Sequence, residues 1–197
     1  MDHHAVNDEA LDRIFRSARS FDRWTDKHVS VAHLMAVYDL ARFGPTSANC
    51  SPARFVFLTT PEAKERLAQF AGGGNAPKIR AAPATVIIGH DLDFAQKLPE
   101  LFPKDPTAKT WFKDPKVEEV TAFRNATLQG AYFIVAARAL GLDCGPMSGF
   151  NNAKVDAEFF AGTRIKSNFI CSVGYGDPAG LSSRPPRISF DDACTIL

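Results

Sequence analysis

Two arginines and a hydroxyl stand within four residues near the amino terminus, in the run Arg16-Ser17-Ala18-Arg19. Arginine presents forked N–H donors that suit phosphate oxygens. A second pair of cations, Arg184 and Arg187, flanks two prolines near the carboxyl terminus. The first cluster alone is more typical of a charged helix end, so these residues indicate a phosphate site only where several such donors converge.

Three further segments carry polar groups that could bind a flat heteroaromatic ring. The loop 45–49, with the sequence PTSAN, offers hydroxyl and amide groups to the edge of such a ring, although alone it would be an ordinary turn. After a glycine-rich break, the Asn75 amide and the Lys78 ammonium stand three residues apart. The segment 145–149, GPMSG, ends on a glycine that would let a backbone N–H approach a ligand closely.

Familiar catalytic motifs are missing or incomplete. The chain has no GxxxxGK[ST] run, and Ser148 lacks the GxSxG context of a hydrolase nucleophile. The glycines at 174, 176 and 180 resemble a dinucleotide-binding loop, but the third comes one place late and Pro178 stands where a helix should begin. The four cysteines form no CxxC pair and no zinc-ligand spacing. We therefore expect no metal site, and free thiols favour a reducing compartment.

The hydrophobic pattern predicts the elements that must position these polar segments. Helical spacing of apolar residues and helix-starting residues predict short helices at about 7–20, 30–43, 61–70 and 153–160. Short apolar runs predict buried strands at 55–58, 84–89 and 169–173. The longest predicted helix begins at Asp114-Pro115 and ends near Leu140, with Gly141 as its terminating residue. Small residues in its middle allow close backbone approach, so we expect it at the centre of the fold or at a subunit interface.

Composition narrows the class of protein. The chain has 197 residues, 45% of them hydrophobic, and a formal charge of +1. With no repeat and no shift in composition, we expect one α+β domain over residues 1–197. No broad basic field would attract nucleic acid or an anionic membrane. The longest apolar run, at 131–137, is far too short to span a bilayer, and no secretory signal is visible, so we expect a cytoplasmic protein.

The ordered set of segments resembles the FMN-dependent nitroreductase family, and within it the malonic-semialdehyde reductase branch of pyrimidine catabolism. The matching stretches cover the chain from about Phe15 to Leu197: GPTSANCSPARFVF, TAFRNATLQGAYFIVAARALGLDCGPMSGF, KSNFICSVGYGDP and RPPRISFDDAC. The resemblance implies a three-layer α+β sandwich, with a mixed sheet flanked by helices. It also implies an intertwined homodimer with one FMN at each end of the subunit interface.

The resemblance assigns each polar segment to a part of FMN. Contacts to the phosphate and ribityl chain are implied for Arg16, Ser17, Arg19, Arg184 and Arg187. Contacts to the isoalloxazine edge, made from the partner subunit, are implied for Pro45, Thr46, Ser47 and Asn49. The pyrimidine edge is assigned to Asn75 and Lys78. The segment packed by the reactive N5 is assigned to Pro146, Met147, Ser148 and Gly149. These donors suit a phosphate of nearly two charges, and a cation such as Lys78 or Arg19 would stabilise negative charge near N1.

The implied chemistry is a two-step hydride exchange with NADH or NADPH as transient co-substrate. The cofactor performs the difficult chemistry, so no side chain is named as catalytic. The small-molecule acceptor is expected to be malonic semialdehyde, reduced to 3-hydroxypropionate, because Ser148 stands where many nitroreductases carry an acidic residue. The alternatives are a nitro or quinone reductase, a flavin-binding storage or sensor protein, and a ligand-free structural dimer. Four aromatic residues are candidates to line the acceptor side, with core packing as the alternative for each: Phe102, Trp111, Phe112 and Phe123.

Overall fold

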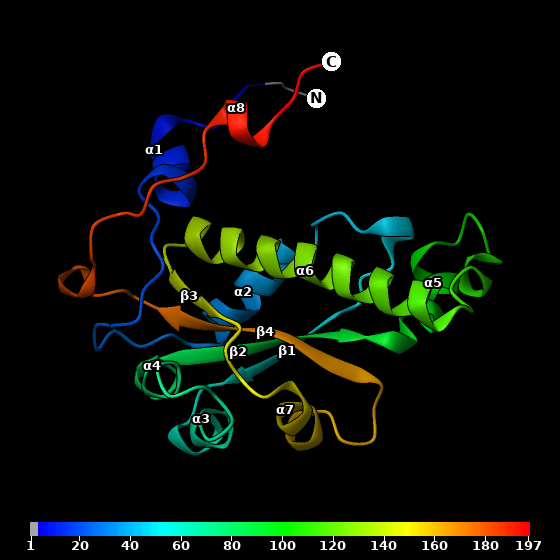
Figure 1. Ribbon diagram of the computed structural model, residues 1–197, viewed down its shortest axis with the longest axis horizontal. Coiled ribbons are helices and arrows are strands. Elements are labelled where there is room, and N and C mark those ends of the chain that lie inside the picture. The colour runs from blue at the N-terminus through cyan, green and yellow to red at the C-terminus, as the bar shows by residue number, and fades with distance from the viewer. Residues whose placement is uncertain (1–3) are drawn as a thin grey trace.

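Four strands form one sheet at the centre of the computed structural model, which describes residues 4–197 (Figure 1). Their order is β1-β2-β4-β3, and every neighbouring pair is antiparallel. The strands are β1 (Ala53–Leu58), β2 (Ala84–Asp91), β3 (Asp143–Met147) and β4 (Ile165–Gly174). The sheet is therefore antiparallel rather than mixed as expected. Its one parallel contact within the described residues is the isolated bridge between Ser20 and Cys144.

Helices cover both faces of the sheet and give the expected three layers (Figure 1). On one face lie α2 (Val31–Ala41) and α6 (Pro115–Ala139). On the other lie α3 (Pro61–Ala68), α4 (Ala76–Ala81) and α7 (Asn152–Phe159). The α+β sandwich is thereby confirmed. None of the helices in residues 4–197 is long and apolar enough to cross a membrane.

Short helical turns make up the rest. The amino-terminal helix α1 (Asp8–Leu11) continues as a π-helical turn over Asp12–Arg16, so the helix expected at 7–20 ends early. The region between β2 and α6 is irregular as expected, and contains α5 (Leu98–Leu101). Near the end of the chain, α8 (Phe190–Ala193) begins at the predicted cap, because the Ser189 hydroxyl accepts a hydrogen bond from the Asp192 N–H.

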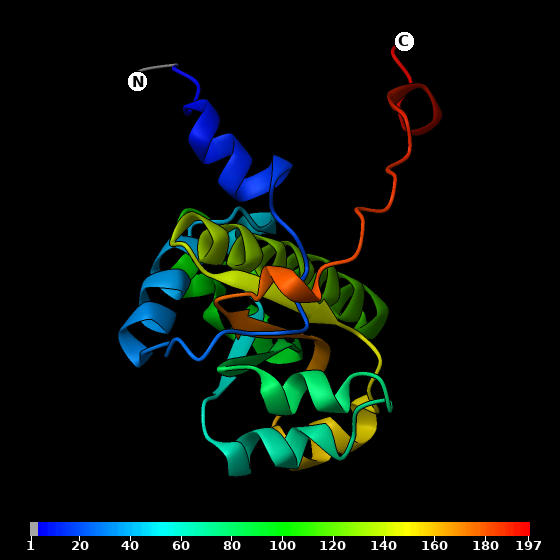
Figure 2. The ribbon, with the colours of Figure 1, turned by 90° about the vertical axis from the view of Figure 1, so that its left-hand side faces the viewer.

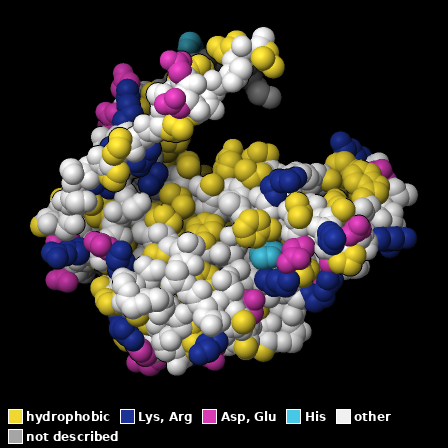
Figure 3. Space-filling model, in the orientation of Figure 1, with side chains coloured by type: hydrophobic (Ala, Val, Ile, Leu, Met, Phe, Trp, Pro, Cys, Tyr) yellow, Lys and Arg dark blue, Asp and Glu magenta, His cyan; other side chains and the backbone are white. Residues whose placement is uncertain are grey.

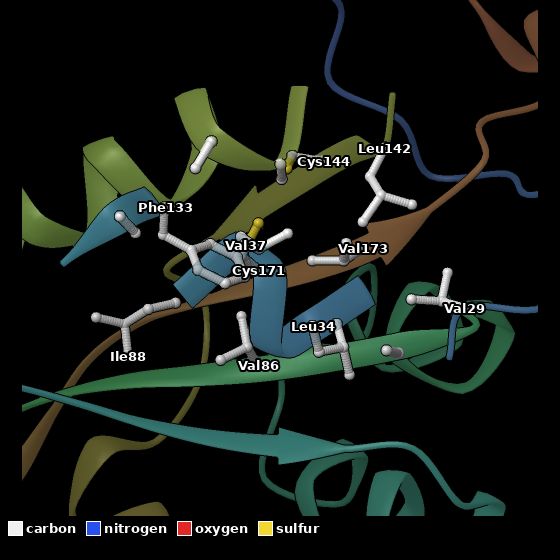
Figure 4. Close-up of a cluster of buried hydrophobic side chains, with 14 residues drawn as sticks. Val29, Leu34, Val37, Val86, Ile88, Phe133, Leu142, Cys144, Cys171 and Val173 are labelled. Carbon is white, nitrogen blue, oxygen red and sulfur yellow. The ribbon is translucent and has the colours of Figure 1, made fainter. Parts of the chain in front are cut away.

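The core between α6 and the sheet explains why small residues occupy the helix middle. Phe133 of α6 packs against Val86 of β2 and Cys171 of β4, beside Val37 of α2 (Figure 4). A Cβ atom added at Gly130 would lie 2.5 Å from the Phe169 ring, which no real contact allows. The glycine therefore sets how closely α6 approaches the sheet.

The two terminal segments project beyond the same side of the sandwich. The helix α1 and the carboxyl-terminal segment both leave the body there, and a quarter-turn of the view separates them (Figure 2). The carboxyl-terminal segment exposes Ile188, Phe190 and Ile196, the last of them 84% exposed.

Candidate cofactor site

The arginines from the two ends of the chain lie together. Arg184 donates from Nη2 to the carbonyls of Arg16 at 2.9 Å and Ala18 at 2.8 Å. Arg19 donates from Nη2 to the Ser182 carbonyl at 2.7 Å. The structure thus brings three of the predicted phosphate-binding arginines into one cluster, with Ser17 between two of them.

Two of the four predicted phosphate-binding arginines have other partners. The Arg16 guanidinium pairs with Asp8 and Asp12, each at 2.6 Å, so a phosphate would have to compete with two exposed carboxylates. Among residues 4–197, the hydrogen-bond acceptors of Arg187 are the carbonyls of Pro185 and Pro186 in its own segment. It stands on the projecting carboxyl-terminal segment, outside the cluster.

Two of the three predicted ring-binding segments meet at the edge of β3. The chain after Arg19 runs beside this strand, where the Phe21 N–H donates to the Cys144 carbonyl at 3.0 Å. A Cβ atom at Gly145 would lie 2.2 Å from the Phe21 carbonyl oxygen, so only glycine permits this approach. Lys78 lies 3.5 Å from Asp22 of the same stretch. The Asn75 amide donates to the Gly149 carbonyl at 3.1 Å.

A cavity of about 340 Å³ opens against this edge. Its wall is formed by Pro146, Met147 and Ser148, the segment assigned to the flavin N5. Small-molecule sites commonly have volumes of roughly 300–1,000 Å³. The facing residues come from α6 and β4: Thr127, Ala131, Ile134 and Phe169.

The loop 45–49 lies apart from these segments. The Ser47 N–H donates to Oδ1 of Asn125 in α6 at 2.8 Å, and the Asn49 amide donates to the Leu101 carbonyl at 2.8 Å. The amino-terminal segment is instead tied to the carboxyl-terminal end of α6, where Arg13 donates to the Arg138 carbonyl at 3.1 Å. Asn125 and Arg138 are thirteen residues apart in this helix, or roughly 20 Å. Within one chain, the loop 45–49 is therefore held well away from the amino-terminal segment that carries the arginines.

A second cavity, of about 850 Å³, lies along α6 and was not predicted. It contains His90, which is only 4% exposed and whose buried Nδ1 has no hydrogen-bond partner in the described part of the chain. Burial, and then the nearby Lys166, lower the pKa of His90. The sequence feature that could have indicated this cavity is the histidine at the end of the apolar strand ATVIIGH.

The four candidate acceptor-side aromatics divide into two groups. Phe112 packs edge-on against the buried Phe94 at 4.9 Å, and Phe102 packs on the same cluster. Trp111 and Phe123 are half-exposed, and Phe123 lines the larger cavity beside His90. Core packing therefore accounts for Phe112 and Phe102. Trp111 packs on the rings of these two from the surface, and Phe123 is the one of the four that lines the larger cavity.

Apolar side chains also cover the outside of α2 and α6. On α2 the apolar side chains face two ways, because Leu34 and Ala41 are buried while Met35 is 62% exposed. Figure 3 shows hydrophobic side chains gathered over α6, in the hollow beneath the terminal segments. Its exposed apolar residues include Val120, Phe123, Leu128 and Tyr132. Large exposed apolar surfaces of this kind are typical of interfaces.

The family model described as "Nitroreductase family" matches residues 15–175. The chain belongs to the nitroreductase family. Two relatives are each named "Putative NADH dehydrogenase/NAD(P)H nitroreductase". The protein from Caulobacter sp. (strain K31) is 58% identical over 188 residues, 95% of this chain and 96% of its own length. The protein HadB from Ralstonia pickettii is 55% identical over 190 residues, 95% of this chain and 97% of its own.

Solved nitroreductases share the fold at low sequence identity. A "putative nitroreductase in complex with FMN" from Exiguobacterium sibiricum has a TM-score of 0.86 at 19% identity, with both chains fully covered. A "putative NAD(P)H:FMN oxidoreductase" from Staphylococcus epidermidis has a TM-score of 0.83 at 18% identity, again with both chains fully covered. The nitroreductase fold is therefore confirmed across the whole chain.

Proposed function

We propose that this nitroreductase-family protein is an FMN-dependent NAD(P)H oxidoreductase, and that it acts as a homodimer. The observation that carries the proposal is the separation of the polar segments along α6. The amino-terminal segment, which carries the arginines, is tied to the carboxyl-terminal end of this helix through Arg138, and the loop 45–49 is held at its middle by Asn125. A second copy would bring its loop to the first copy's cluster. The oxidoreductase class agrees with the names of the relatives and with the FMN-bound fold neighbour.

The residues present fit FMN. Arg19 and Arg184, whose hydrogen bonds join residues 16–19 to residues 182–184, supply donors of the kind that a phosphate needs. The cavity of about 340 Å³ between Pro146–Ser148 and α6 has room for part of a flat ring. A Cβ atom at Gly149 would lie 2.7 Å from the Asn75 amide nitrogen. Glycine at this position therefore lets the Asn75 side chain lie directly against the backbone. When bound, FMN would take hydride from NADH or NADPH and deliver it to the acceptor.

Lys78 would supply positive charge at the pyrimidine edge. Its partner Asp22, at 3.5 Å, holds the ammonium at the end of the β3 edge. A preorganised cation stabilises negative charge that develops next to it. We therefore assign Lys78 to charge stabilisation and Asn75 to orienting the ring edge, with no side chain acting as an acid or base.

The exposed apolar face of α2 supports the homodimer. Met35 and Phe43 are 62% and 81% exposed, and Val31 and Tyr38 lie on the same side of the helix as Met35. Burial of apolar surface contributes about 25 cal/mol for each Å² removed from water. A second copy covering this face would gain that free energy.

Malonic semialdehyde is the first acceptor that we propose, and Ser148 in the N5 segment supports it. Nitro and quinone acceptors are the second candidate, supported by the names of the relatives. Turnover efficiency with malonic semialdehyde and with a nitroaromatic compound separates the two.

The assignment as an FMN-dependent oxidoreductase is tested by the colour of the purified protein and by its turnover of NADH. Purified protein should be yellow and should bleach under NADH or NADPH without oxygen. A colourless protein that takes up no added FMN would contradict the proposal. Bound flavin without steady-state NADH oxidation by a quinone would indicate a storage or sensor protein.

A further inference from the structure

We propose that Asn125 and Gln129 of α6 are positioning residues for the flavin, which they never touch. They hold the loop 45–53 in the conformation that presents its polar groups to the cofactor of the partner subunit. The inference rests on the proposed function, because it assigns the loop to that cofactor.

The helix α6 contacts the loop at three points along one of its faces. Asn125, Gln129 and Tyr132 are spaced i, i+4 and i+7, so they share a side of the helix. Asn125 accepts from the Ser47 N–H at 2.8 Å, and Gln129 accepts from the Ala53 N–H at 2.9 Å.

Tyr132 provides the third point. A Cβ atom at Gly44 would lie 2.6 Å from its ring. The start, middle and end of the loop are therefore all set by this one helix.

The loop between these points is strained. Ala48, Asn49 and Ser51 have φ values of 49°, 52° and 39°, a left-handed region that residues other than glycine rarely adopt. Such conformations persist only where surrounding contacts over-determine them. Within the loop, the Thr46 hydroxyl accepts from the Ser51 N–H at 3.1 Å. The loop is tied to the body by its bonds to α6, by the bond from Asn49 to the Leu101 carbonyl, and by the bond from the Asp91 N–H to the Pro52 carbonyl at 2.9 Å.

The choice of amides on a buried helix face supports this role. Asn125 and Gln129 are only 1% and 6% exposed. Buried amides are costly unless they are hydrogen-bonded, and asparagine is a poor helix former. The amide nitrogen of Asn125 donates to the Thr121 carbonyl at 2.8 Å. Both side-chain oxygens are thus committed to backbone N–H groups of the same loop.

The test compares FMN affinity with stability in the full-length dimer. Asn125→Leu removes the acceptor for Ser47, and we expect FMN to bind about tenfold more weakly because the loop loses its conformation. Asn125→Asp keeps an oxygen acceptor and should restore most of the affinity. Thr85→Val is the matched control, since it removes a buried hydrogen bond to Ser172 inside the sheet. FMN dissociation constants come from flavin fluorescence titrations, and thermal midpoints are measured without FMN.

The outcomes separate positioning from general stability. Weaker FMN binding in Asn125→Leu but not in Thr85→Val, at similar losses of thermal midpoint, supports the proposal. Equal FMN affinity in Asn125→Leu and wild type overturns it, while a wild type that binds no FMN overturns the proposed function instead. Gln129→Met gives an independent second variant if Asn125→Leu does not fold.

A mixed dimer tests whether the loop acts on the partner's flavin. An Asn125→Leu chain paired with an Arg19→Ala chain contains one site with an intact loop and an intact arginine cluster. We expect this dimer to bind FMN at wild-type affinity in half of its sites. Two weakened sites would show that the loop acts within its own chain, which contradicts the proposal.

Discussion

The Arg184 guanidinium donates to the Arg16 carbonyl across 168 residues of sequence, at 2.9 Å. With the bond from Arg19 to the Ser182 carbonyl, it ties the two ends of the chain into one cluster. These bonds also orient both guanidinium groups before any ligand binds. Preorganisation of this kind lowers the entropic cost of binding.

Replacing Arg184 by alanine should therefore weaken FMN retention. Both the direct donor and the bond that positions residues 16–18 would be lost, so we expect a loss of about 1.5–3 kcal/mol, the scale of a hydrogen bond to a charged group. Equilibrium dialysis of the flavin measures it, with Arg19→Ala expected to behave similarly. Arg187→Ala is the comparison variant, because in the structure of residues 4–197 Arg187 bonds its own segment and lies outside the cluster. Unchanged retention in Arg19→Ala and Arg184→Ala would place the phosphate elsewhere.

Removing the charge of Asp22 should raise the flavin reduction potential. Asp22→Asn leaves Lys78 without its carboxylate partner at 3.5 Å, so more positive charge faces the reduced ring. Both side chains are partly exposed, and such pairs contribute about 1 kcal/mol at most. The expected rise is up to roughly 20 mV for a two-electron couple. An anaerobic redox titration measures it, and an unchanged or lowered potential would remove Lys78 from the flavin edge.

Adding a methyl group at Gly130 should destabilise the fold. The new Cβ would lie 2.5 Å from the Phe169 ring, which is held between α6 and the sheet. Overpacking of this kind costs about 1–3 kcal/mol. Urea unfolding of Gly130→Ala measures the loss in the free energy of unfolding. Gly73→Ala is the control, because nothing lies within 4 Å of a Cβ at that position.

The long helix could be predicted from sequence because its end signals are local. Asp114 accepts from the Lys116 N–H at 2.8 Å, and Gly141 has a φ of +82°, as the helix-capping pattern requires. The strand β3 was missed because Gly145-Pro146 is unusual in a strand. Its place at the edge of the sheet explains why proline is tolerated there.

The candidate site was only partly predictable. The resemblance implied its segments, and the structure brings Arg16, Arg19 and Arg184 of these together. Long-range contacts such as Asn125 to Ser47 leave no local signal, because they join residues 78 positions apart. Nor does apolar spacing distinguish Leu34, which faces its own core, from Met35, which faces outward.

The buried His90 should make stability depend on pH. Burial and Lys166 lower its pKa in the folded protein below the ordinary value of 6.5, against smaller opposing effects of Glu119 and Asp156. As the pH falls below about 6.5, the unfolded chain therefore takes up the proton first. The stability that the neutral His90 contributes is therefore fully present above pH 6.5, and it is lost as the pH falls toward the pKa of His90 in the folded protein. Urea unfolding between pH 7 and 5 should show a shallower decline in His90→Leu than in wild type. The exposed His28→Leu should retain the wild-type slope.

A charge on the outer face of α2 should abolish both the dimer and the flavin site. Met35 is 62% exposed, and Met35→Glu would bury a carboxylate wherever a second copy covers this face. We expect a monomer by light scattering, with FMN affinity reduced at least tenfold because the partner's loop 45–49 is lost. His33→Glu lies on the opposite side of the same helix and should leave the dimer intact. A Met35→Glu protein that is monomeric yet binds FMN normally would show that one chain completes the site by itself.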